Sequence, residues 1–137
     1  MNYLIGAVLA LLVAVFARFT GFDRERSFYS TVLIVVASYY VLFAVVGGST
    51  RALILELLLM VVFVVCSVAG FKGSMWLVVA GLAGHGVMDS FHGRVVTNPG
   101  LPVWWPGFCM AYDVVAAACL AWIIKVPVRT APILGGE

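Results

Sequence analysis

The chain consists of long apolar stretches separated by short polar breaks. Five of these stretches are long enough for a membrane helix, which needs about 20 mostly apolar residues. They cover residues 3–19, 28–46, 52–71, 75–95 and 108–125. The breaks at residues 47–50 and 72–74 have the composition of tight turns, and residues 23–26 are all charged. The pattern predicts an all-helical, polytopic membrane protein with five spans, which forms one domain over residues 1–137.

The composition indicates that lipid is the solvent of this fold. Hydrophobic residues make up 64% of the chain and charged residues 10%, whereas soluble domains average roughly 45–50% and about 25%. A 137-residue globule could not bury so much apolar side chain. We therefore expect the lipid bilayer as the main partner. The net charge is only +2, and the chain has no run of basic residues. This excludes a basic surface that binds nucleic acid.

The distribution of basic residues predicts the orientation. Cytoplasmic segments of membrane proteins carry an excess of Lys and Arg. An N-terminus outside the cell gives six basic residues inside, namely Arg18, Arg24, Arg26, Lys72, Lys125 and Arg129, and two outside, Arg51 and Arg94. We therefore expect the N-terminus outside and the C-terminus inside. Asp23, Glu25 and Glu137 are then expected in water.

The remaining acids and both histidines fall in the outer half of the predicted membrane region. His85, Asp89 and His92 have the spacing i, i+4, i+7 and would share one face of the fourth helix, within roughly 60° of arc. Glu56 of the third helix and Asp113 of the fifth lie at a similar depth. The two histidine Cα atoms would be ~10 Å apart along the axis. One ion could therefore bind one histidine, Asp89 and ligands from other helices, or two ions could share Asp89.

Three interpretations of this cluster stay open. Imidazole and carboxylate groups are suitable ligands for a divalent transition metal. A ladder of ionisable groups also suits a proton or cation path, since such groups are costly inside a membrane and are functional candidates there. The third interpretation is structural, with polar side chains joining helices by hydrogen bonds.

Several residues around the cluster are candidates for a lid or an interface. The segment 98–107 contains three prolines, and its Trp104 and Trp105 are either interfacial anchors or part of a stiff lid above His92. Cys109 lies one turn before Asp113 on the same face. Arg94, Tyr39 and Tyr40 are possible partners of Asp113, and the two tyrosines could equally belong to an interfacial belt.

These motifs resemble two groups of proteins. The pattern HGxxDxxH at residues 85–92, followed by NPGxP at 98–102, WWPxFC at 104–109 and YD at 112–113, resembles a group of small, uncharacterised bacterial integral membrane proteins. This resemblance implies a multi-pass protein of the cell membrane, which in a bacterium is the inner membrane. It indicates no particular activity. The shorter HGxxD element is similar to bacterial membrane carotene dioxygenases, in which histidines bind iron. Those enzymes have more histidines and more helices, so no catalytic residue is carried over.

The sequence therefore leads to one main functional hypothesis and two alternatives. The cluster is expected to hold a divalent metal and to act on a lipid-like or extracytoplasmic small molecule. It could instead serve a small proton- or cation-coupled transporter, which would be a homo-oligomer because five helices enclose little space. A non-catalytic membrane subunit is the third possibility. Whether the protein is an enzyme stays open.

Overall fold

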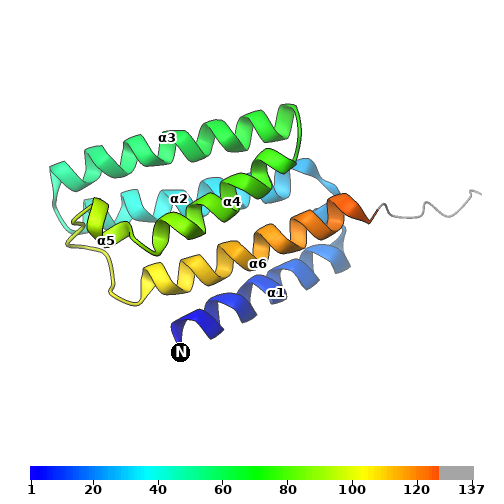
Figure 1. The fold of residues 1–137 in the computed structure, drawn as a ribbon, viewed down its shortest axis with the longest axis horizontal. Helices are drawn as coiled ribbons and strands as arrows, with labels where there is room; N and C mark the ends of the chain where they lie inside the picture. The colour runs from blue at the N-terminus through cyan, green and yellow to red at the C-terminus, as the bar shows by residue number, and fades with distance from the viewer. Residues whose placement is uncertain (127–137) are drawn as a thin grey trace, which may run out of the picture.

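A computed structural model describes residues 1–126 as a bundle of helices in which consecutive long helices run in opposite directions (Figure 1). The elements are α1 (Asn2–Thr20), the short 3-10 helix η1 (Phe22–Arg24), α2 (Arg26–Val46), α3 (Thr50–Lys72), α4 (Trp76–Asp89), α5 (His92–Val95) and α6 (Trp105–Lys125). This part of the chain contains no strand. The expected all-helical class is confirmed.

α1 packs on α6, α6 on α4, α4 on α3 and α3 on α2, while α2 lies behind α4 in the view of Figure 1 and also contacts α4 and α6. Four of them, α1, α2, α3 and α6, are long and apolar enough to cross a membrane. Large apolar side chains point outward along them, including Leu12, Val62 and Trp122, which are more than half exposed. Such a surface is stable in lipid and not in water. The bundle is therefore that of a membrane protein.

The predicted span 75–95 is not one continuous helix. α4 ends at Asp89, and its 14 residues cover only about 21 Å, less than the roughly 30 Å of a bilayer core. Ser90 and Phe91 form a turn before α5 begins. The Ser90 hydroxyl donates a 2.6 Å hydrogen bond to the Val87 carbonyl, a local contact that competes with the helical ladder.

The connection from α5 to α6, residues 96–104, is shorter than predicted because α6 already begins at Trp105. Pro106 lies in its first turn, where a missing N–H costs nothing. Gly100 packs directly against the carbonyl of Phe43 and the backbone of Gly47, with no room for a Cβ atom. The connection is thus held against the α2–α3 turn.

Close packing of α4 against α6 depends on Gly86. A Cβ atom there would lie 3.2 Å from the Met110 carbonyl and 3.3 Å from Cβ of Asp113. The absence of a side chain therefore lets Asp113 approach α4. Gly84, two residues earlier, is exposed and has open space around it.

The charged connection between α1 and α2 is only partly in water. Glu25 is exposed as expected, but Asp23 is buried and pairs with Arg18 at 3.1 Å. The expectation that Asp23 lies in water was wrong, because Arg18 in the last turn of α1 reaches back to it. Glu137 and Arg129 lie outside the described residues.

Candidate functional site

A cluster of buried polar side chains occupies the half of the bundle next to α5. Its members come from five helices and one loop, and each is at most 9% exposed: Tyr40, Glu56, His85, Asp89, His92, Asn98, Cys109 and Asp113. The cluster divides into two groups, one around His85 and one around His92.

The first group lies between α4 and α6. His85 Nδ1 is 2.6 Å from Asp113 Oδ2 and 3.7 Å from Asp89 Oδ2. Helical spacing explains the approach of His85 to Asp89, since residues four apart share a face. The Cys109 thiol contacts Asp113 Oδ2 at 3.7 Å from one turn earlier on α6. One imidazole, two carboxylates and one thiol therefore converge.

The second group joins α3, α5 and the following loop. His92 Nε2 lies 3.0 and 3.2 Å from the two carboxylate oxygens of Glu56. The Asn98 amide donates to Glu56 Oε1 at 3.0 Å and to the Tyr40 carbonyl at 3.1 Å. Asn98 thus ties the loop to both α2 and α3 and covers the second group.

Tyr40 of α2 connects the two groups. Its hydroxyl donates to Asp89 Oδ1 at 2.6 Å. Its ring centroid lies 4.4 Å from that of His92 and 5.6 Å from that of His85. Phe63 of α3 packs edge-on against His85 from another side, at 4.7 Å. The aromatic rings therefore pack against both imidazoles, which are buried.

The charge balance of the cluster is unusual. It holds three carboxyl groups and two imidazoles, and every Lys and Arg side chain within residues 1–126 is exposed. Three buried atoms of the cluster have no hydrogen-bond partner within residues 1–126, namely Asp89 Oδ2, Asp113 Oδ1 and His92 Nδ1. Buried carboxylates must be neutralised by protons or by a cation. The cluster is therefore suited to carry protons or to bind a cation.

The first group fits a metal ion. One ligand atom from each of His85, Asp89, Cys109 and Asp113 can be chosen so that all four lie within 4.8 Å of one another. Ligand atoms around a four-coordinate ion with bonds of about 2.1 Å are separated by about 3.4 Å. Small side-chain shifts would bring these atoms to that spacing. His92 and Glu56 are not part of this group.

The structure places the residues that the sequence singled out as follows. Glu56, His85, Asp89, His92 and Asp113 lie in one buried cluster. His92 does not share a helix with His85 and Asp89, because α4 ends before it. From the sequence, two ions, one on each histidine, could share Asp89 on one helix face. The structure does not provide that common face.

Most of the residues proposed as partners of Asp113 or as a lid lie outside the buried cluster. Arg94 is exposed and is not the partner of Asp113, which is held by His85 instead. Tyr40 is a core residue, while Tyr39 is 38% exposed and packs on Trp105 at 5.0 Å. Trp104 is half exposed, so Asn98 rather than the tryptophans covers His92.

Sequence reasoning missed Asn98 and Phe63 as site residues. The sequence offers Asn98 only as the first residue of the NPGxP motif and of the segment 98–107. Its available signal was an amide side chain next to the polar triplet, at the start of a stiff loop. Phe63 carried no signal, because one aromatic residue in an apolar helix looks like any other.

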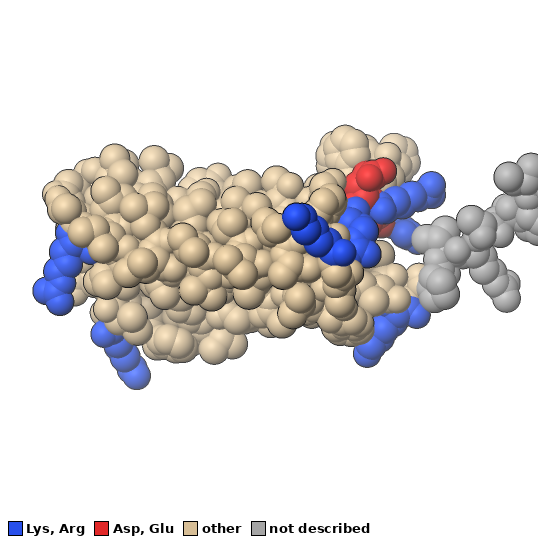
Figure 2. Space-filling model, turned by 90° about the horizontal axis from the view of Figure 1, so that it is seen from above, with Lys and Arg blue, Asp and Glu red and all other residues tan. Residues whose placement is uncertain are grey.

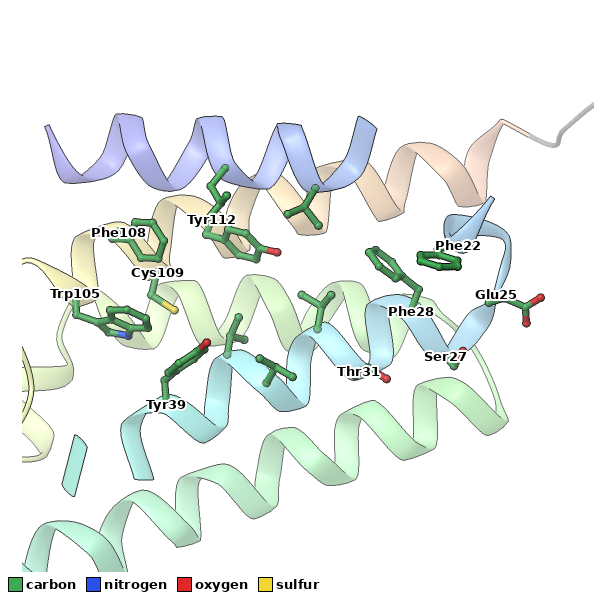
Figure 3. A pocket seen from close by; sticks show the side chains of 15 residues that line it. Phe22, Glu25, Ser27, Phe28, Thr31, Tyr39, Trp105, Phe108, Cys109 and Tyr112 are labelled. Carbon is green, nitrogen blue, oxygen red and sulfur yellow. The ribbon is translucent and has the colours of Figure 1, made fainter. Parts of the chain in front are cut away.

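An apolar groove reaches this site from the side of the bundle (Figure 3). It has a volume of about 590 Å³ and lies between α1, α2 and α6. It exists because α1 packs mainly on α6 rather than on α2. Tyr39 and Trp105 line one end, and Phe22 and Glu25 the other. Cys109 belongs both to the groove wall and to the first group.

The comparisons with known proteins add no relative. No family model matches the chain, and neither a curated protein nor a solved structure matches it. The residues of the cluster and their geometry are therefore the basis for a function.

Proposed function

We propose that His85, Asp89 and Asp113 bind a divalent transition metal inside the membrane. The observation that carries this proposal is the convergence of their ligand atoms in a buried group that lacks any Lys or Arg. A dication would neutralise the two carboxylates and would give the free oxygens of Asp89 and Asp113 a partner. Imidazole and carboxylate ligands suit zinc, iron and manganese.

The position of Cys109 decides which type of metal site this is. Three protein ligands leave an open coordination position for a substrate, whereas four protein ligands close the site. Cys109 is the one member of the first group that also lines the groove. We infer that it faces the open position and is not needed to hold the metal. The ion would then polarise an oxygen atom of a bound molecule, as a Lewis acid does.

The groove supports a lipid-like substrate. Its walls on α2 run from Ser27 to Tyr39, about 18 Å along the helix axis. Most of the lining side chains are apolar, which suits a hydrocarbon chain. A lipid could enter from the bilayer without crossing water. Tyr39 and Tyr112 line the groove together with Cys109, and their hydroxyls would contact polar groups of the substrate.

Metal analysis of the purified protein tests the proposal. After growth with added zinc, iron and manganese, we expect about one metal ion per chain, lost in Asp113→Asn. Glu56→Gln is the matched control, because it removes a buried carboxylate of the second group and should retain the metal. Absence of stoichiometric metal in the wild type, or equal loss in both variants, would overturn the proposal.

We further propose that the chain spans the cell membrane of a bacterium five times, with its N-terminus outside. The fourth span would consist of α4, the turn and α5. Arg18, Arg24, Arg26, Lys72 and Lys125 lie at the ends of helices on one side of the bundle, and Arg51 and Arg94 on the other. Blue side chains occupy the two ends of the face seen in Figure 2, with an uncharged region between them.

Labelling of single introduced cysteines checks the orientation. Serine replaces the three native cysteines, and a cysteine is placed at Ser49 or at Ser74. A membrane-impermeant maleimide applied to intact cells should label position 49 and not position 74. The reverse result would invert the orientation.

A proton- or cation-coupled transporter is the second candidate function. The observation that favours it is the buried series of ionisable groups, from the pair of His92 and Glu56 to the pair of His85 and Asp89, with the Tyr40 hydroxyl bonded to Asp89. In proteoliposomes, flux of protons or cations should then be abolished by Glu56→Gln or Asp89→Asn. A metal-binding protein that shows no flux would leave the metal centre as the function.

A further inference from the structure

A second cavity lies away from the buried cluster, near the connection between α1 and α2. It has a volume of about 640 Å³. Its walls come from the second half of α1 and the second half of α6, with apolar residues such as Val15, Val115 and Ile123. Three polar side chains line it as well, those of Arg18, Asp23 and Tyr29. The cavity therefore combines a long apolar wall with a polar end.

Two buried atoms at the polar end have no partner. The Asp23 side chain is 1% exposed, and its Oδ2 accepts from Arg18 while Oδ1 accepts no hydrogen bond. The Tyr29 hydroxyl is also buried without a partner, and Tyr29 is 3% exposed. Leaving such groups unpaired is unfavourable. A ligand that donates a hydrogen bond to Asp23 and contacts Tyr29 would satisfy both.

The charges at this end are of opposite sign. Asp23 is an acceptor, and Arg18 uses only one of its side-chain nitrogens on it. The rest of the guanidinium is available, since the Arg18 side chain is 56% exposed. Guanidinium groups bind phosphate oxygens well. The pair has no net charge, so it complements a molecule that carries both a phosphate and an ammonium group better than an anion.

The location matches the depth of a lipid headgroup. Arg18 lies in the last turn of α1 and Asp23 in the adjoining η1, where the chain leaves the membrane-spanning helix. Headgroups and interfacial tryptophans occupy this level. Trp122, which is 70% exposed, stands on the same cavity wall.

We propose that this cavity binds a membrane phospholipid with a zwitterionic, primary-ammonium headgroup. The phosphate contacts Arg18, the ammonium donates to Asp23 Oδ1, and an oxygen of the headgroup pairs with the Tyr29 hydroxyl. One acyl chain lies against the apolar walls of α1 and α6. The site is separate from the proposed metal centre and does not depend on it.

Native mass spectrometry of the delipidated full-length protein tests this site. The protein is titrated with phosphatidylethanolamine and with phosphatidylglycerol that carry identical acyl chains. We expect one high-affinity phosphatidylethanolamine, bound at least about tenfold more tightly than phosphatidylglycerol, a difference of about 1.4 kcal/mol. Equal affinity for the two lipids would overturn the proposal and would leave the polar end to water.

Two variants locate the binding. Asp23→Asn removes the negative charge and should abolish the headgroup preference, while Arg24→Gln, which removes a charge at the neighbouring exposed position and lies outside both cavities, should keep it. Tyr29→Phe preserves the pair between Arg18 and Asp23, so it stays informative if Asp23→Asn fails to fold. We expect Tyr29→Phe to lower the affinity for phosphatidylethanolamine severalfold. Unchanged binding in folded Tyr29→Phe and Asp23→Asn would also contradict the proposal.

Discussion

The hydroxyl of Tyr40 donates a 2.6 Å hydrogen bond to Asp89 Oδ1, across the contact between α2 and α4. This bond directs the other carboxylate oxygen, Oδ2, toward His85 Nδ1 at 3.7 Å. Tyr40 therefore orients a proposed metal ligand without being one. Groups that orient ligands in this way contribute strongly to metal affinity.

Removal of this hydroxyl should weaken metal binding. We expect Tyr40→Phe to lower the affinity by about 10–100-fold, because Asp89 loses the donor that orients it. Competition with a chromogenic chelator measures the change. Tyr39→Phe is the matched control, since the Tyr39 hydroxyl makes no hydrogen bond within residues 1–126. If both variants bind metal like the wild type, Tyr40 has no such role.

Removal of the thiol should leave the metal in place. Cys109→Ala is expected to retain about one ion per chain, whereas His85→Ala should lose it, because the imidazole is a ligand and the thiol faces the open position. Elemental analysis of the purified variants measures this. Loss of the ion in Cys109→Ala would indicate a closed, structural site with four protein ligands, and the proposed lipid-like substrate would have no place on the metal.

Two glycines of α4 offer a direct test of helix packing. Gly86→Leu should destabilise the protein by about 1–3 kcal/mol, because its side chain would collide with α6 around Met110 and Asp113. Gly84→Leu should be nearly neutral, since open space surrounds this position. Unfolding in mixed micelles, followed by circular dichroism, provides the comparison. Equal stability of the two variants would mean that α4 and α6 are farther apart.

The loop over His92 should open when Asn98 is truncated. Asn98→Ala removes the hydrogen bonds to the Tyr40 carbonyl and to Glu56, so residues 96–104 should exchange amide hydrogens faster. Hydrogen exchange with mass spectrometry detects this. Thr97→Ala, at an exposed neighbouring position, should show no change. Identical exchange in both variants would argue against a lid held by Asn98.

Arg26 should stabilise the far end of the bundle. Its guanidinium donates to the carbonyls of Gly70, Phe71 and Gly73 and so caps the C-terminus of α3. Arg26→Ala should cost about 1–2 kcal/mol, since these carbonyls lose a charged donor. Arg24→Ala has the same change in charge and, in this part of the chain, no side-chain hydrogen bond to lose. Thermal unfolding in the same micelles should show a lower unfolding temperature for Arg26→Ala than for Arg24→Ala.

Local rules were enough to predict part of this arrangement. Long apolar stretches indicated the helices because a membrane demands them. His85 and Asp89 meet through helical spacing alone. By contrast, the 2.6 Å contact of His85 with Asp113 depends on the rotation of α6 about its axis and on the close approach at Gly86. No pattern within either helix specifies that rotation.

Two other features depend on contacts between neighbouring elements. The end of α4 at Asp89 falls inside the predicted span 75–95, where the hydroxyl of Ser90 supplies the competing bond. Asp23 looks solvated because it lies in a run of four charges, yet Arg18 pairs with it from five residues earlier. Hydropathy does not distinguish a paired, buried charge from a hydrated one.

The break between α4 and α5 affects how this protein can evolve. His85 and Asp113 are carried on two helices in tight contact, so a change in one must be matched by the other. His92 and Asn98 are carried on a short helix and a loop beyond the break. Insertions and substitutions there can reshape their side of the cluster while the helical pair keeps its geometry. The second group can therefore vary independently of the proposed metal ligands.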